Sequence, residues 1–179
     1  MKNDLVKVLE VIPGIAQELI YATKNNFTGT PVYPPIATAY LCLAPAQRLK
    51  RVQEALKERG LALKIWDAYR PHSVQKIFWE RLPDPRYVGD PAKGSKHNRG
   101  AAVDLTLIDL LGNELSMQST FDDFSERAHR STSHCPNVQI LTDAMVKAGF
   151  LIYESEWWHF EDPNWANYPI LDIPFERLS

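Results

Sequence analysis

The stretch from Ala101 to Asp109 constrains the fold more than any other part of the sequence. It reads AAVDLTLID and follows a glycine, and its aliphatic and β-branched residues are typical of a buried strand. Side chains alternate between the faces of a strand, so one face carries three large residues and is predicted to pack into the core: Val103, Leu105 and Leu107. Asp104 lies on the other face with Ala102 and Thr106, whose small side chains leave room for a ligand.

Two other stretches have the composition of strands. LALKIWDAYRP at 61–71 and WWHFE at 157–161 are dominated by aliphatic and aromatic residues, with glycine or proline close by. No internal repeat or linker divides the chain. Together with the helices described next, these strands predict an α+β fold, a single domain over residues 1–179 with a small, mainly antiparallel sheet flanked by helices.

Apolar residues at helical spacing predict the helices. Two segments begin at a proline and end at a glycine, Pro45 to Gly60 and Pro136 to Gly149, which suits the first turn and the C-terminal cap of a helix. Shorter helices are predicted at 73–82 and 120–130. The proline-containing segment 28–44 predicts a long loop that lies on the domain.

The charge balance limits the partners. The chain has 20 Lys and Arg and 22 Asp and Glu residues, for a formal net charge of −2. No strong field draws such a protein to nucleic acid or to an anionic membrane, so a small neutral or zwitterionic partner fits better. The sequence makes no prediction of the oligomeric state.

The N-terminal residues and the cysteines bear on the compartment. Acidic residues such as Asp4 and Glu10 interrupt any secretory signal, and no apolar run approaches the roughly 18 residues of a membrane span. Cys42 and Cys135 are too few for a disulfide framework and predict reduced thiols. These features predict a cytoplasmic protein, whereas a leader removed before residue 1 would instead allow a periplasmic location.

A histidine and an aspartate lie near the start of the predicted strand 101–109. His97 precedes Asp104 by seven residues, so a straight strand would send the two side chains to opposite faces. They converge only if the backbone turns between them, which Gly100 permits. The alternative is a surface turn with a solvated histidine and an aspartate that hydrogen-bonds nearby amides.

A second pair of this kind lies in ESEWWHFED. Glu156 precedes His159 by three residues, with two tryptophans between them. A carboxylate and an imidazole so placed resemble a general base beside a metal ligand, although a bend near Glu156 is then required. The alternative is a buried tryptophan core beside a solvated glutamate.

The two pairs together suggest a metal site. His97, Asp104 and His159 supply two imidazoles and one carboxylate, a ligand set suited to one Zn²⁺ per chain with a fourth position open to water. Glu156 could accept the proton of that water, a combination that favours hydrolysis.

Arg70, in WDAYRP, is the candidate for stabilising the transition state. Its guanidinium, at the end of a predicted strand, could bind the oxyanion of a tetrahedral intermediate. The alternative is an ion pair with Asp67 that only holds the turn before Pro71.

The motifs resemble those of a known family. Ser95-x-His97-x-x-Gly100-x-Ala102-x-Asp104, with EWWH at 156–159 and WDAYRP at 66–71, resembles the zinc D-alanyl-D-alanine dipeptidases of the VanX type. YATKNNFTGTPV at 21–32 is similar to the opening motif of that family, and FDDFSERAH at 121–129 to its middle one. The Ser-x-His motif is shared with a wider group that includes DD-carboxypeptidases and the hedgehog signalling domain, which implies the hedgehog/DD-peptidase-like fold.

The resemblance implies a role for each matching residue. It makes His97, Asp104 and His159 the zinc ligands, Glu156 the general base and Arg70 the transition-state stabiliser. It also places three residues around the substrate, namely Tyr21, Ser95 and Asp122, with Asp122 the partner of the substrate ammonium group. The segment 71–93 has no clear counterpart in the family.

The expected function is zinc-dependent hydrolysis of the D-alanyl-D-alanine dipeptide to two D-alanines, in a cavity closed at both ends. One alternative is a DD-carboxypeptidase or L-alanyl-D-glutamate peptidase acting on peptidoglycan peptides. Another is a non-catalytic, zinc-stabilised binding module. Glu156 and Arg70 argue against the binding module, because a structural zinc site needs neither a base nor an oxyanion donor.

Overall fold

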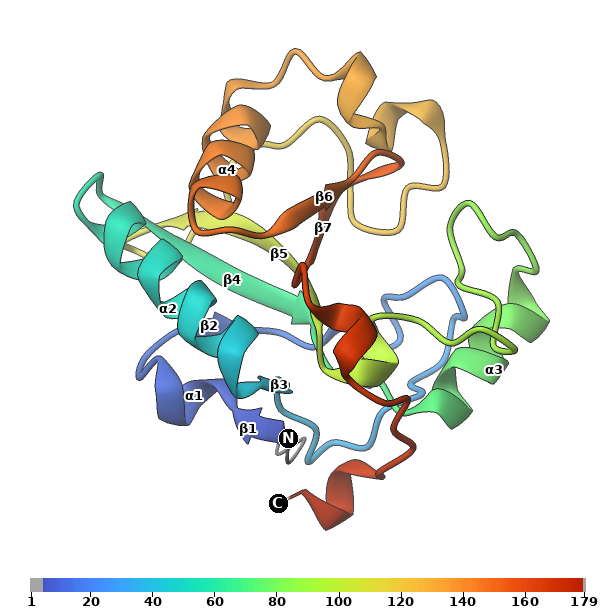
Figure 1. The fold of residues 1–179 in the computed structure, drawn as a ribbon. Coiled ribbons are helices and arrows are strands. Elements are labelled where there is room, and N and C mark those ends of the chain that lie inside the picture. Colours follow the sequence, from blue (N-terminus) through green and yellow to red (C-terminus); the bar gives the residue numbers. More distant parts are fainter. Residues whose placement is uncertain (1–4, 179) are drawn as a thin grey trace.

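The computed structural model describes residues 5–178 and has an α+β fold (Figure 1). Its main sheet has five strands in the order β2-β4-β5-β7-β6. Their bounds are Ala16–Gln17 (β2), Leu61–Asp67 (β4), Ala102–Asp109 (β5), Glu156–Glu161 (β7) and Leu151–Tyr153 (β6). β2 is parallel to β4 and the other pairs are antiparallel, which confirms the predicted sheet.

Helices pack around this sheet. Their bounds are Val8–Val11 (α1), Leu43–Lys57 (α2), His72–Arg81 (α3) and Pro136–Lys147 (α4). α2 and α4 contact each other and the sheet, and Figure 1 shows α3 on the other side of the molecule. The helices predicted at 45–60, 73–82 and 136–149 are therefore confirmed, with ends shifted by at most three residues.

β5 is buried on both of its faces. Val103, Leu105 and Leu107 are fully buried, as their predicted core position requires. The opposite face is not open to solvent, since Asp104 and Thr106 are also buried. β5 pairs with β4 on one side and β7 on the other, so Asp104 lies inside the molecule and not on an open ledge.

The helix predicted at 120–130 is wrong. This region contains only two 3-10 turns, Glu126–Ala128 and Arg130–Thr132. Asp122 has a φ of 56°, in the left-handed region that no α-helix contains. Next to it, the ring of Phe121 packs between Trp66 and Trp158, with centroid distances of 5.1 and 5.4 Å. Aromatic packing and the turn at Asp122 therefore override the local helical spacing.

The long loop predicted at 28–44 is confirmed only as far as residue 39. Tyr40–Cys42 forms strand β3, which pairs with β1 (Leu5–Lys7) in a separate two-stranded sheet, and α2 follows directly. The amide of Cys42 donates to the carbonyl of Gly100 at 2.8 Å, so this small sheet is joined to the turn before β5.

The two cysteines and the helix lengths agree with the sequence. Cys42 and Cys135 are both free thiols, as predicted. Among residues 5–178, no helix is long and apolar enough to cross a membrane.

Candidate active site and metal centre

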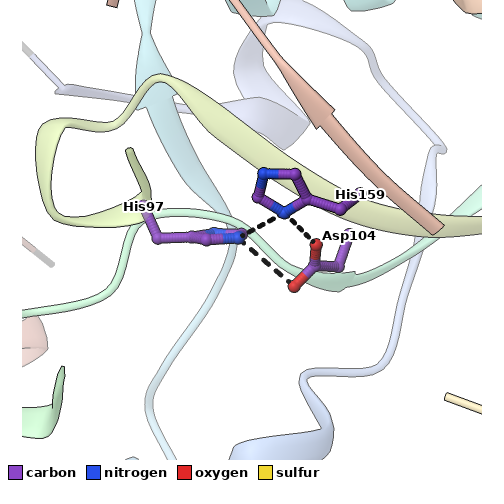
Figure 2. Close-up of side chains that lie close together, drawn as sticks. All are labelled: His97, Asp104 and His159. Atoms are coloured by element: carbon purple, nitrogen blue, oxygen red, sulfur yellow. Dashed lines mark hydrogen bonds and ion pairs between the residues drawn. The ribbon is translucent and has the colours of Figure 1, made fainter. Parts of the chain in front are cut away.

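Three side chains converge beside the carboxyl end of β4 (Figure 2). His97 comes from a 3-10 turn before β5, Asp104 from β5 and His159 from β7. Nε2 of His97 lies 3.1 Å from Nδ1 of His159 and 3.3 Å from Oδ2 of Asp104, and Nδ1 of His159 lies 2.9 Å from Oδ1 of Asp104. All three are buried, and their potential ligand atoms lie within 4.8 Å of one another.

The backbone brings these residues together in two ways. Asp104 and His159 lie directly opposite each other in the antiparallel pairing of β5 with β7. His97 reaches them through Gly100, whose φ of 61° reverses the chain as predicted. A Cβ at residue 100 would clash with Leu5 and lie 3.1 Å from the backbone nitrogen of Cys42, so this position requires glycine.

The outer nitrogen of each imidazole has a hydrogen-bond acceptor. Nδ1 of His97 donates to the carbonyl of Ala68 at 2.7 Å, because a carbonyl only accepts. Nε2 of His159 lies 3.1 Å from a carboxylate oxygen of Glu161 and donates to it. The two inner nitrogens, Nε2 of His97 and Nδ1 of His159, therefore face each other and Asp104, the arrangement found around metal-bound histidines.

The charges at the cluster favour a cation at its centre. Burial opposes the charged form of His159, but hydrogen bonds to Asp104 and Glu161 outweigh it and raise the pKa of His159 to about 10. Burial would likewise raise the pKa of Asp104, but the two imidazoles hold it well below its usual value. The cluster therefore favours a bound cation. Its two imidazoles and one carboxylate fit a Zn²⁺ ion and leave one coordination position for a further ligand.

Glu156 lies at the start of β7, beside the cluster. The pairing of β6 with β7 is irregular there, because Tyr153 pairs with Glu156 while the preceding Ile152 pairs with Phe160. This irregularity is the bend that the three-residue spacing requires, and it brings Oε2 of Glu156 to 3.8 Å from Nδ1 of His159. Burial, reinforced by the negative charge of Asp104, raises the pKa of Glu156 to about 8 despite the opposing effect of His159.

Arg70 combines the two roles that the sequence left as alternatives. Its Nη2 and Nε donate to Oδ2 of Asp67 at 2.7 and 3.1 Å, so the ion pair is present. The guanidinium also lines the same cavity as the metal cluster, and Nη2 lies 4.0 Å from Oδ2 of Asp104. Burial works against its charge, but Asp67, together with weaker contributions from neighbours such as Asp104, keeps the pKa of Arg70 well above its usual value.

A cavity of about 150 Å³ opens onto these groups. The three predicted substrate residues line it, namely Tyr21, Ser95 and Asp122. The hydroxyl of Tyr21 donates to Oδ1 of Asp122 at 3.0 Å, and Oδ2 of Asp122 is buried and has no hydrogen-bond partner among residues 5–178. Burial raises the pKa of Asp122 to about 7, although the Tyr21 hydrogen bond lowers it. Asp122 is therefore a partly unpaired carboxyl group among the residues that line the cavity.

The segment for which the sequence gave no role forms a wall of this cavity. Residues that follow α3 line it, among them Pro85, Tyr87 and Val88. The Tyr153 hydroxyl donates to the carbonyl of Arg86 at 3.0 Å and joins this wall to β6. The irregular loop after α3 thus closes one side of the site.

Sequence reasoning missed Glu161 and Lys96, which both line the cavity. Glu161 could have been found, because a residue two positions after His159 in a strand lies on the same face. Lys96 had no such signal, since it lies in the turn before β5.

A family model described as D-ala-D-ala dipeptidase matches residues 1–176. The D-alanyl-D-alanine dipeptidase of Escherichia coli is 39% identical and covers 97% of this chain and 92% of its own length. The protein of the same name from Enterococcus faecalis is 33% identical, covering 98% and 95%.

A solved structure, titled as that of the LdcB LD-carboxypeptidase, covers 98% of this chain and 92% of its own, with 18% identity and a TM-score of 0.48. The family match and the curated relatives cover nearly the whole chain. This chain belongs to the D-ala-D-ala dipeptidase family of peptidases.

Proposed function

We propose that this protein hydrolyses the dipeptide D-alanyl-D-alanine to two D-alanines with the help of zinc. The observation that carries the proposal is the cavity in which a His-Asp-His cluster, the buried Glu156 and the guanidinium of Arg70 face one another. Membership of the D-ala-D-ala dipeptidase family supports the choice of substrate.

His97, Asp104 and His159 would hold one zinc ion per chain. When bound, the ion would supply Lewis acidity, which polarises a carbonyl group and makes a water molecule more acidic. The protein supports this role by fixing the outer nitrogen of each histidine with an acceptor, the carbonyl of Ala68 or the carboxylate of Glu161.

Glu156 is the general base in this proposal. It takes a proton from the attacking water and passes it to the nitrogen of the leaving D-alanine when the peptide bond breaks. A pKa near neutrality suits a carboxylate that must both accept and donate a proton in one turnover.

Arg70 stabilises the negative charge that develops on the scissile carbonyl oxygen. Its two hydrogen bonds to Asp67 fix the guanidinium plane before the substrate arrives. The group therefore needs little reorientation to reach the transition state. Phe78 lies against the guanidinium, with Cζ of Arg70 4.5 Å from the ring centroid, and limits access of water to it.

Asp122 binds the free ammonium group of the dipeptide through its unpartnered oxygen, and Tyr21 holds the carboxylate in place. Ser95 lines the same cavity. A carboxylate buried at the amine end favours a dipeptidase over a carboxypeptidase, because the carboxypeptidase must admit a longer chain there. Glu156 and Arg70 disfavour a purely structural zinc module.

The single domain over 1–179 and the cytoplasmic location stay predictions.

The test is release of free amine from three compounds side by side: D-Ala-D-Ala, L-Ala-D-Glu and an N-acylated D-Ala-D-Ala. We expect hydrolysis of the first alone, because the acyl group removes the charge that Asp122 binds. Comparable rates on the acylated compound would instead support the carboxypeptidase, and no release from any of them would support the binding module.

A further inference from the structure

Glu161 lies on the same face of β7 as His159, two residues further along the strand. In the pairing with β5, His159 lies opposite Asp104 and Glu161 lies opposite Ala102. Ala102 has only a methyl group, so it leaves space on this face for the longer side chain of Glu161. The carboxylate is buried and contacts the imidazole of its neighbour.

This contact determines which nitrogen of His159 is free to bind a metal. Oε1 of Glu161 lies 3.1 Å from Nε2 of His159 and accepts its proton. Nδ1 is then left to the cluster, where it lies 2.9 Å from Asp104 and 3.1 Å from His97. Without the acceptor, neither the tautomer nor the ring plane of His159 would be fixed.

Lys96 completes the arrangement from the other side. Its Nζ lies 3.1 Å from the same oxygen of Glu161 and 5.2 Å from the ring centroid of Trp165. The ammonium group balances the charge of a carboxylate whose side chain is 9% exposed. Because Lys96 precedes His97 in the chain, one turn supplies both a candidate ligand and the partner of Glu161.

We propose that Glu161, held by Lys96, is a positioning residue that fixes the tautomer and ring plane of His159 for metal binding. The inference rests on the proposed function, since it assigns a role in forming the zinc site. Glu161 is not a ligand in this arrangement, because it binds the imidazole nitrogen that points away from the cluster.

The test measures zinc affinity, by competition with a chromophoric chelator, in the full-length protein. Glu161→Leu should weaken zinc binding by about 10- to 100-fold, the usual effect of losing the acceptor behind a metal-bound histidine. Glu161→Gln retains an acceptor oxygen and should recover most of the affinity. Lys96→Met should have a smaller effect of the same sign.

The chain offers a matched control. Oε1 of Glu114 accepts from Nε1 of Trp66 at 3.2 Å and from Nζ of Lys64 at 2.9 Å, which is the same grouping of ring, carboxylate and lysine away from the cluster. Glu114→Leu should leave zinc affinity unchanged. Equal affinities for Glu161→Leu and Glu114→Leu would overturn the proposal.

A second measurement tests the proposal on the wild-type protein, so it holds even if a Glu161 variant folds poorly. In the zinc-loaded wild type, nitrogen-15 NMR of the histidines should show a protected Nε2 proton on His159, which exchanges faster in Glu161→Gln and Glu161→Leu. An unprotected Nε2 proton in the wild type would also overturn the inference. If the wild type itself binds no zinc, the proposed function fails; if it binds zinc but Glu161→Leu binds as tightly, only this inference fails.

Discussion

The metal cluster and the cavity walls are built on different kinds of backbone. Asp104 and His159 lie on paired strands, and every polar atom they present to the cluster has a partner. Asp122 lies on a loop with left-handed φ, and one of its oxygens has no hydrogen-bond partner within the part of the chain that the structure describes. The comparison indicates that paired strands hold two of the proposed metal ligands in fixed positions, whereas a loop carries the residue proposed to bind the substrate.

The largest expected effect comes from removing a side chain of the metal cluster. Imidazole and carboxylate ligands create the site together, so His97→Ala should lose stoichiometric zinc and, with it, activity. Chelation of the wild type should have the same effect on activity and be reversed by zinc. Metal analysis of purified protein checks this, and a His97→Ala protein with one tightly held zinc would remove His97 from the ligand set.

Removing the base should separate chemistry from metal binding. Glu156→Ala should lower turnover by about 10²- to 10⁴-fold, because proton transfer is lost while the three ligands remain. Zinc content and the far-ultraviolet circular dichroism spectrum should stay as in the wild type. Loss of zinc would make Glu156 a ligand, and near-normal turnover would exclude it as the base.

Arg70 lies between the end of β4 and the start of α3. It has two roles, since it pairs with Asp67 and is proposed to bind the oxyanion. Arg70→Ala should lower turnover by roughly 10²- to 10³-fold, the cost of losing one oxyanion donor. It should also destabilise the protein by about 3–5 kcal/mol, because Asp67 is left buried without its charge partner.

Two further variants separate these contributions. Arg70→Lys should restore part of the stability and little of the turnover, because a lysine lacks the planar fork. Asp67→Asn, compared by thermal denaturation and by turnover per folded molecule, should affect stability more than rate. Full recovery of turnover by lysine would mean that charge alone matters at residue 70.

The smallest effect on catalysis is expected for the loop residue Asp122. Its substitution should also stabilise the protein above pH 7, whereas Arg70→Ala destabilises it. Asp122→Asn should raise KM for D-Ala-D-Ala by about 10- to 100-fold, the value of one charged hydrogen bond. The folded pKa of Asp122 is about 7, above its ordinary value of 3.8, so the folded protein retains a proton that the unfolded chain loses. Stability contributed by this group is therefore present at low pH and lost as pH rises from about 4 to 7.

Asparagine at residue 122 abolishes that pH dependence. The variant should be more stable than the wild type above pH 7 by more than about 1 kcal/mol, measured by urea denaturation of the metal-free protein. A variant less stable than the wild type above pH 7 would show that the buried carboxylate is compensated in the folded state.

Sequence patterns located the parts of this molecule that depend on local rules. The alternation in AAVDLTLID identified β5, and Gly100 explained how His97 could turn toward Asp104. Strands of two or three residues were missed, because their formation depends on distant partners, as β1 depends on β3. The loop at Asp122 was misassigned as a helix, since the packing of Phe121 is not visible in local spacing.

The register of β5 against β7 has a consequence for how the protein matures. His159 comes to Asp104 only when segments 55 residues apart have paired, and a slip of one residue would turn the imidazole to the other face. A chain still emerging from the ribosome therefore has no complete site until residue 159 is out and in register. An ion bound at that moment would link Asp104 to His159, which are 55 residues apart, and would stabilise the folded chain. The supply of metal during synthesis should therefore influence how much of the protein escapes proteolysis.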